Sequence, residues 1–304
     1  MKLGICLSGG GVKGAAHIGA LKAFEEQGIK FDYISGTSSG SIVATLYAVG
    51  YTPEEIYKLF KKYCKEIKYI DLKNIIKGVL GLILKKQIII DGLNSGNKIE
   101  KIINEACKQK NIKNINQIRK NLIIPAVDLN DGKLYVFSSK ENRNTYSDDM
   151  VYIYNANIGK AVQASCSYPG VFSPCKYNNT KLIDGGIREN IPWKLTKING
   201  ADKVISIIFE KEIKNKKNKE NIIDVVTKAI DILSHELSTY ELAGSDYLLK
   251  IKSENIELLD ISKIDYLYDL GYKVVSQEIQ NRKMKIWFQT RKWSIINVTI
   301  EQVN

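Results

Sequence analysis

The sequence predicts an α/β fold, a three-layer α/β/α sandwich in which helices cover both faces of a mainly parallel sheet. Two observations support this prediction. Short apolar segments alternate with segments whose apolar residues recur at helical spacing, and glycine-rich turns join them. The 304 residues are enough for one large domain, and neither an internal repeat nor a linker rich in Pro, Ser or Gly divides the chain.

The first fifty residues show the alternation most clearly. Residues 2–7 form a short apolar strand that ends in a glycine loop, and residues 12–27 form a helix with Gly28 at its end. A second strand follows at 31–35, and a second helix ends near Gly50. This order predicts parallel strands that are joined by crossover helices.

The rest of the chain continues the pattern less regularly. Thr52 and Pro53, followed by two acids, are typical of a helix start, and the helical region reaches about residue 110. Further elements are predicted from apolar runs and turn signals. These are strands at 122–127, 134–137 and 203–209, a hairpin turn at 130–132, a solvated loop at 210–220, and long helices at 222–242 and 264–288.

Composition narrows the class of protein. No stretch reaches the roughly 18 apolar residues of a membrane-spanning helix, and the start lacks the pattern of a secretory signal. Five scattered cysteines without a CxxC pair favour reduced thiols in the cytoplasm over a disulfide framework or a metal site. The net charge of +12 suits an anionic membrane surface or nucleic acid, and a Lys-rich composition explains it equally well.

A candidate nucleophile lies between the second strand and the second helix. Gly36-Thr37-Ser38-Ser39-Gly40 matches the GxSxG elbow, in which a serine at a sharp strand-to-helix turn exposes its hydroxyl at the end of the sheet. The pattern alone is weak, because a serine at an ordinary helix N-cap also matches it. Its place between a strand and a helix favours the catalytic interpretation.

The glycine-rich turn that opens the first helix is a second candidate site. It consists of Gly9-Gly10-Gly11-Val12-Lys13-Gly14. Such a turn presents free backbone N–H groups, which bind either nucleotide phosphates or the oxyanion of a tetrahedral intermediate. The glycines also match a dinucleotide fingerprint, but Asp32 lies at the start of the second strand rather than at its end. Beside a nucleophile elbow, the oxyanion role is favoured.

The base for such a serine is less obvious, because the chain has only two histidines. His17 follows the glycine loop, where packing or a local hydrogen bond is the expected role, and His235 lies inside a helical pattern. Asp184 stands at a strand end before Gly185 and Gly186, a pattern that alone indicates only a turn. A catalytic triad that includes His235 remains open.

These three blocks, in this order, resemble the signature of the patatin-like phospholipase family. Two further stretches agree with that family, 125–129 (PAVDL) with Gly132, and 164–174 (ASCSYPGVFSP). The resemblance is strongest over 2–208, within an expected patatin-like domain of residues 1–290. Residues 291–304 are left as a C-terminal extension of unassigned role.

The resemblance implies a Ser–Asp dyad, which fits the shortage of histidines. It implies that Ser38 attacks an acyl ester, that Asp184 accepts its proton, and that an acyl-serine intermediate forms. The backbone amides that would hold the oxyanion are those of Gly9, Gly10 and Gly11. The implied activity is that of a lipid acyl hydrolase, of the phospholipase A or lysophospholipase type, without a metal or cofactor.

The substrate implied by the resemblance is a phospholipid or lysophospholipid, met at an anionic membrane surface. A general esterase or thioesterase is the alternative within the fold. The alternative of another class is a nucleotide- or nucleic-acid-binding protein that uses the Gly9–Gly14 loop or the basic surface.

Two segments bear on partners. Residues 75–86 are apolar and bracketed by lysines, which indicates either an interfacial helix or lid, or a buried core helix. Residues 285–293 resemble part of a homeodomain recognition helix, but Thr290 stands where that helix has its adenine-reading asparagine. We therefore expect no nucleic-acid partner, and the sequence does not indicate an oligomeric state.

Overall fold

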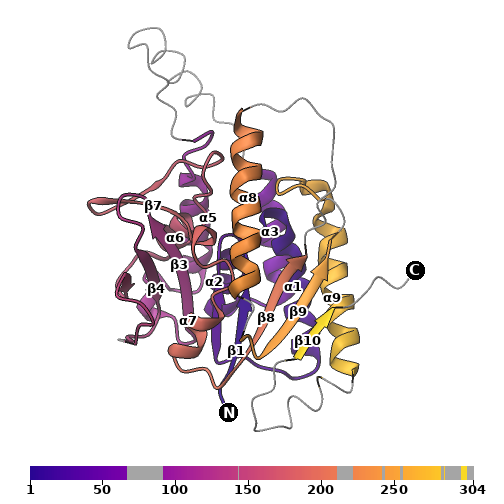
Figure 1. The fold of residues 1–304 in the computed structure, drawn as a ribbon. Coiled ribbons are helices and arrows are strands. Elements are labelled where there is room, and N and C mark those ends of the chain that lie inside the picture. The colour runs from indigo at the N-terminus through magenta and orange to yellow at the C-terminus, as the bar shows by residue number, and fades with distance from the viewer. Residues whose placement is uncertain are drawn as a thin grey trace.

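The computed structural model describes residues 1–66, 92–142, 144–210, 222–241, 244–253, 256–281, 284 and 296–299. These residues form one sheet with helices on both faces, so the predicted three-layer α/β/α architecture is confirmed (Figure 1). The segments 75–86 and 285–293, and all but the first residue of 210–220, lie outside the described residues.

The sheet is mainly parallel. In the described part of the chain its path runs β10-β9-β8-β1-β2-β3-β4-β5, and neighbours from β10 to β3 are parallel. The path strands are β1 (Leu3–Leu7), β2 (Tyr33–Gly36), β3 (Asn121–Asp128), β4 (Leu134–Ser138), β5 (Met150–Ile153), β8 (Lys203–Glu210), β9 (Tyr247–Lys252) and β10 (Ile296–Thr299). Off this path lie β6 (Cys175–Tyr177) and β7 (Thr180–Asp184).

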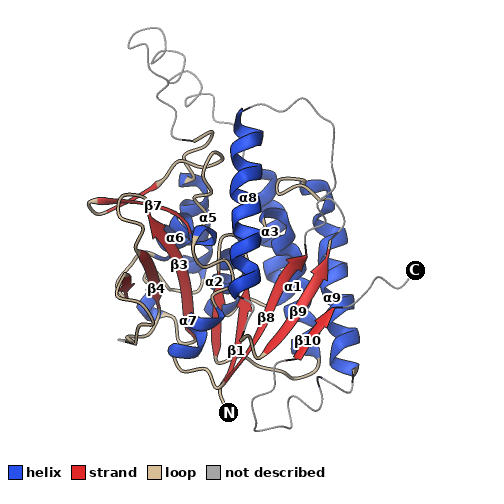
Figure 2. Cartoon of the chain, in the orientation of Figure 1, coloured by secondary structure: helices blue, strands red, loops and turns tan. Residues whose placement is uncertain are grey.

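The helices form two unequal layers. Figure 2 shows α7 (Trp193–Ile198) and α8 (Ile222–Glu241) on the near face of the sheet. The other layer contains α1 (Gly14–Glu26), α2 (Ser39–Val49), α3 (Pro53–Glu66), α5 (Asn97–Gln109), α6 (Ile158–Ser165) and α9 (Ile264–Gln280). The described helix α9 ends at Gln280, whereas the sequence predicted a helix to residue 288.

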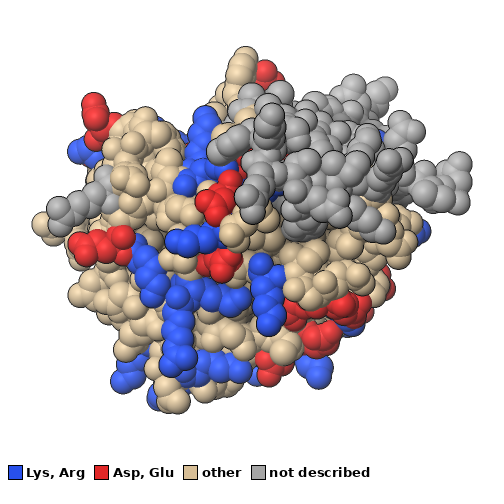
Figure 3. Space-filling model, turned by 90° about the horizontal axis from the view of Figure 1, so that it is seen from below, with Lys and Arg blue, Asp and Glu red and all other residues tan. Residues whose placement is uncertain are grey.

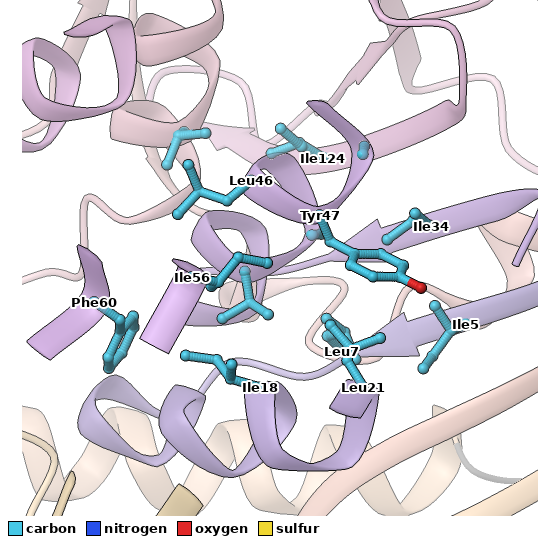
Figure 4. Packing of buried hydrophobic residues seen from close by; sticks show 14 of the residues in the cluster. Ile5, Leu7, Ile18, Leu21, Ile34, Leu46, Tyr47, Ile56, Phe60 and Ile124 are labelled. Carbon is cyan, nitrogen blue, oxygen red and sulfur yellow. The ribbon is translucent and has the colours of Figure 1, made fainter. Parts of the chain in front are cut away.

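The central strands of the sheet are mainly apolar because both faces of the sheet are covered there. Every residue of β1 is buried, with Ile5 and Leu7 in the larger core and Cys6 in the smaller one. In the larger core, Ile5 and Leu7 pack near Ile18 and Leu21 of α1 (Figure 4). This double cover holds β1 and the loop that follows it in a fixed position.

A change of neighbour along β3 determines which strand ends lie close together at one edge of the sheet. The first part of β3 pairs with β2, with Ser35 opposite Ile123. Beyond the end of β2, the antiparallel strand β7 takes the same edge, and its last residue Asp184 lies opposite Ala126. The chain that leaves β2 therefore meets the end of β7.

Candidate active site

Ser38 lies at the turn between β2 and α2 in a strained backbone conformation. Its φ is 52° and its ψ is −126°, a combination that costs a non-glycine residue about 1–3 kcal/mol. The predicted strand–serine–helix arrangement is therefore present. The turn places the half-buried Ser38 at the wall of a cavity.

The glycines of the elbow are required by close packing. A Cβ atom on Gly36 would lie 2.3 Å from the carbonyl oxygen of Gly40, and one on Gly40 would lie 2.3 Å from that of Leu7. Thr37 between them is buried and donates its hydroxyl hydrogen to the carbonyl of Glu189 at 2.8 Å. The GxSxG spacing thus reflects the tightness of the turn against β1.

Asp184 lies at the end of β7 on the same cavity and is fully buried. Its Oδ1 accepts a hydrogen bond from the N–H of Gly186 at 2.8 Å, while Oδ2 is buried without a hydrogen-bond partner. Burial raises the pKa of Asp184 to about 7, although the Gly186 amide and the Ser38 hydroxyl lower it.

The last residue of α6 and the segment that follows this helix connect the two candidate residues. The hydroxyl of Ser165 accepts a hydrogen bond from the N–H of Ser38 at 3.1 Å. The carbonyl of Ser167 accepts one from the N–H of Asp184 at 3.0 Å. This segment belongs to the 164–174 stretch, whose sequence gave no indication of these two contacts.

The glycine loop lines the cavity next to Ser38, and Asn190 holds one end of it. The N–H of Gly9 donates to Oδ1 of Asn190 at 3.1 Å, and Nδ2 of Asn190 donates to the hydroxyl of Ser238 at 3.1 Å. The N–H groups of Gly10 and Gly11 have no acceptor among the described residues. Sequence reasoning missed Asn190, since nothing in its spacing from Asp184 indicates contact with the loop.

His17 supports the glycine loop from behind. Its buried ring donates from Nε2 to the carbonyl of Ser8 at 2.9 Å and lies 4.6 Å from the Phe209 ring, centroid to centroid. Burial lowers the pKa of His17 to about 4, so the ring is neutral at pH 7. The expected role of packing with a local hydrogen bond is confirmed.

The cavity has a volume of about 400 Å³ and is lined by both apolar and polar side chains. The apolar ones include Ile42, Phe60, Ile99, Phe172, Phe209 and Leu259. The polar ones include Lys13, Asn190, Glu210, Ser234, Ser238 and Lys250. Such a cavity can hold a molecule with an apolar chain and a polar end.

The cavity brings together most of the residues that the sequence singled out. Its wall contains Gly9, Gly10, Gly11, Val12, Lys13, Ser38, Ser39, Asp184 and Gly186. The others support the wall from behind, namely Gly14, Gly36, Thr37, Gly40 and Gly185. His235 lies on α8, and the position of its side chain is outside the described part of the structure.

Among the described residues, no three or more His, Cys, Asp or Glu side chains form a group that could hold a metal ion. No described helix combines the length and the apolar character that crossing a bilayer requires.

Comparison with known proteins identifies the family of this chain. The sequence profile of patatin-like phospholipases matches residues 5–197, well over half of the chain. The chain belongs to the patatin-like phospholipase family. The matched region contains Ser38, Asp184 and the glycine loop, so the blocks on which the resemblance rested lie inside it.

Two relatives of this patatin-like chain are uncharacterised proteins. YqhO of Bacillus subtilis (strain 168) is 34% identical over 199 residues, which cover 62% of this chain and 65% of YqhO. R571 of Acanthamoeba polyphaga mimivirus is 30% identical over 298 residues, which cover 90% of this chain and 93% of R571. The mimivirus protein thus matches this patatin-like chain over almost its whole length.

A third relative carries a functional name, and a solved structure shares the fold. Lysophospholipase NTE1 of Meyerozyma guilliermondii is 27% identical over 206 residues, 67% of this chain but only 12% of that much longer protein. The ExoU–SpcU complex of the Pseudomonas aeruginosa type III secretion system matches with a TM-score of 0.51 and 18% identity. That match covers 95% of this chain and 52% of the other, and it concerns the fold alone.

Proposed function

We propose that this protein is a lipid acyl hydrolase that uses Ser38 as nucleophile and Asp184 as base. The observation that carries the proposal is the meeting of the strained Ser38 with the buried Asp184 on one cavity. Family membership and the lysophospholipase relative support the reaction class. The reduced state of all five cysteines supports a cytoplasmic setting, with peripheral contact to membranes.

The proposed reaction has two steps through a covalent intermediate. The Ser38 oxygen attacks the ester carbonyl while Asp184 takes its proton, and Asp184 then returns this proton to the departing alcohol. Water next attacks the acyl-serine, gives its proton to Asp184, and releases the fatty acid as Ser38 regains its hydrogen. A base with a pKa of about 7 suits both transfers, because it accepts and returns a proton readily near neutral pH.

The glycine loop is proposed as the oxyanion hole. Gly10 and Gly11 contribute amides without an acceptor among the described residues, whereas the Gly9 amide is bonded to Asn190 in this conformation. Preorganised N–H donors of this kind stabilise the negative charge of the tetrahedral intermediate. We therefore assign the amides of Gly10 and Gly11 as the direct donors to the oxyanion, and Gly9 as the fixed end of the loop.

The mixed lining of the cavity supports a phospholipid or lysophospholipid as substrate. Side chains such as Ile42, Phe60 and Phe172 provide an apolar wall for an acyl chain, and Lys13 and Lys250 provide positive charge for a phosphate. A general esterase or thioesterase would use the same dyad. Comparing long-chain phospholipids with short-chain esters and acyl thioesters separates these activities.

The test is fatty-acid release from mixed phosphatidylcholine and phosphatidylglycerol vesicles. Ser38→Ala should abolish release, and Asp184→Asn should lower kcat by about 10²–10⁴-fold, as expected for loss of a general base. A fluorophosphonate probe should label the wild type and not Ser38→Ala. Release that survives Ser38→Ala in the folded protein would refute the nucleophile assignment.

A further inference from the structure

Lys250 brings a positive charge to the wall of the cavity without an ionic partner from the described part of the chain. It lies in β9, is half-buried, and lines the cavity beside the carboxyl end of β8. Within the described residues its ammonium group forms neither an ion pair nor a hydrogen bond. Charged groups that are withdrawn from water are ordinarily paired. The charge of Lys250 is therefore available to an anion that enters the cavity.

Glu210, at the end of β8, also lines the cavity, but it has a cation of its own. Its Oε2 lies 3.7 Å from Nζ of Lys252. The register of the two strands explains this pairing, because Glu210 lies opposite Lys252 whereas Lys250 lies opposite the apolar Ile208. Lys252 thus balances the charge of Glu210, and the charge of Lys250 stays unbalanced.

The side chain of Lys250 lies on the face of the sheet that α7 and α8 cover. Side chains alternate along a strand, and in β9 Leu249 belongs to the larger core while Leu248 belongs to the smaller core on the side of α7. Lys250 shares the face of Leu248. On this face α8 contributes two residues to the lining of the cavity, Ser234 and Ser238.

The two serines of α8 differ in what they offer a ligand. The hydroxyl of Ser238 accepts a hydrogen bond from Asn190 and donates its only hydrogen to the carbonyl of Ser234 at 2.7 Å. The hydroxyl of Ser234 has no hydrogen-bond partner among the described residues. Ser234 can therefore donate to the same anion as Lys250.

The strand register also indicates how far Lys250 lies from Ser38. One row of paired residues crosses four parallel strands, and its members are Gly36, Leu7, Ile207 and Leu249. Three strand spacings separate the backbones at the two ends of this row by about 14 Å. Ser38 and Lys250 follow these two ends, and the long lysine side chain narrows the gap. In a lysophospholipid, the short glycerol unit between the ester and the phosphate suits such a gap.

We propose that Lys250 binds the phosphate of a lipid whose ester lies at Ser38, with Ser234 as a second donor, and so selects phospholipids over neutral acylglycerols. The proposal rests on the proposed lipid hydrolase activity and names the residue that determines its substrate class. An ammonium group forms a strong charge-assisted hydrogen bond with a phosphate. A monoacylglycerol has a hydroxyl group at that position and lacks the charge that Lys250 complements.

The first experiment compares lysophosphatidylcholine with a monoacylglycerol of the same medium-length acyl chain, both below their micelle concentrations. Lys250→Met should lower the ratio of their kcat/KM values, phospholipid to neutral lipid, by about 10–100-fold, as expected for loss of a charged hydrogen bond. The loss should appear in KM for the phospholipid, because the phosphate contact exists before and during the reaction. Lys250→Arg keeps the charge and should keep most of the preference.

Lys252→Met is the matched control. It removes the same charge from the same face of the same strand, but Lys252 pairs with Glu210 and does not line the cavity. It should change the ratio by less than about threefold, as expected for a solvent-screened charge. Equal falls in Lys250→Met and Lys252→Met, or an unchanged ratio in Lys250→Met, would overturn the proposal.

A binding measurement distinguishes failure of this proposal from failure of the proposed function. Calorimetry with the Ser38→Ala protein gives the Kd for lysophosphatidylcholine without turnover, and adding Lys250→Met should raise that Kd by at least about tenfold. An unchanged Kd would contradict the role of Lys250. Tighter binding of inorganic phosphate than of the lysolipid would assign the site to free phosphate instead. Absence of hydrolysis by the wild type would refute the proposed function, while the Kd would still decide whether Lys250 binds the lipid.

Discussion

Two opposing requirements meet at the carboxyl group of Asp184. As a base it must be ionised, whereas its complete burial favours the neutral form and raises its pKa to about 7. We expect kcat/KM to fall below pH 7, with a midpoint near that value, because the fraction of ionised Asp184 falls. The pH–rate profile of ester hydrolysis measures this midpoint.

Glu189 provides the matched control for this profile. Burial raises its pKa to about 7 as well, but its carboxylate accepts a hydrogen bond from Tyr146 at 2.6 Å and does not line the cavity. Glu189→Gln should therefore keep the acid limb of the profile. Loss of the acid limb in Glu189→Gln would show that the titrating group is Glu189 and not Asp184.

The same pKa makes a prediction about stability. The folded state holds the Asp184 proton up to about pH 7, whereas the ordinary pKa is 3.8, so this group stabilises the fold below 3.8 and the gain is lost as pH rises through 7. Asp184→Asn, which stays neutral, should melt at a higher temperature than the wild type at pH 8. The difference should shrink at pH 5, and thermal unfolding at both pH values measures it.

Asn190 should matter for rate more than for binding. Asn190→Ala frees the Gly9 amide and lets the loop shift, and a misplacement of about 1 Å can cost up to 10²-fold in rate. We expect kcat to fall with little change in KM for a short-chain ester. Ser238→Ala removes the hydrogen bond between Asn190 and Ser238 but keeps the one to Gly9, and it should affect kcat much less. Equal losses in the two variants would contradict a role through Gly9.

At the scale of elements, helix α3 begins with a reciprocal cap. The hydroxyl of Thr52 accepts from the N–H of Glu55 at 3.2 Å, and the Glu55 carboxylate accepts from the N–H of Thr52 at 2.9 Å. Thr52→Ala should lower the free energy of unfolding by about 1 kcal/mol, and Thr52→Ser should restore it. Urea denaturation measures both, and an unchanged midpoint for Thr52→Ala would show that the cap contributes nothing.

The elements that the sequence predicted share strong local signals. Strands β1 and β2 are bounded by glycine turns, and the predicted range 222–242 agrees closely with α8. Strands β5, β6 and β9 were missed. The three residues of β6 have mixed polarity, whereas β5 (MVYI) and β9 (YLLKIK) are mainly apolar runs, which periodicity alone does not assign to a strand. Strand β10 falls in the extension 291–304, whose role the sequence left open, and it pairs with β9.

The site was predictable where its chemistry is local and not where it depends on the fold. Ser38 and the glycine loop stand in motifs whose geometry follows from a strand, a turn and a helix. Ser165 and Asn190 reach the site through tertiary contacts, for which no spacing in the sequence gives a signal.

At the scale of the whole molecule, a basic face lies at the end of the sheet opposite the candidate site. Figure 3 shows Lys and Arg side chains across the face seen from below, near the amino ends of the parallel strands. The cavity lies at their carboxyl ends, with Ser38 after β2 and Lys250 on β9. Adsorption through the basic face would therefore turn the cavity away from the lipid.

This separation predicts different salt responses for binding and turnover. Raising NaCl from 0.05 M to 0.5 M screens surface charge, because the Debye length falls below about 5 Å. Adsorption to anionic vesicles should drop severalfold, while hydrolysis per bound enzyme should rise as unproductive orientations are lost. Cosedimentation and fatty-acid release from the same samples measure both quantities. A parallel decline of the two would place productive contact on the basic face.

The exchange of β2 for β7 along the edge of β3 has a consequence for synthesis of the chain. The ribosome completes the elbow at Ser38 early, but the proposed base arrives only when β7 pairs with β3. A nascent chain that ends before residue 180 carries the serine without its aspartate. With the proposed dyad, the growing polypeptide can therefore hydrolyse esters only after β7 has paired with β3.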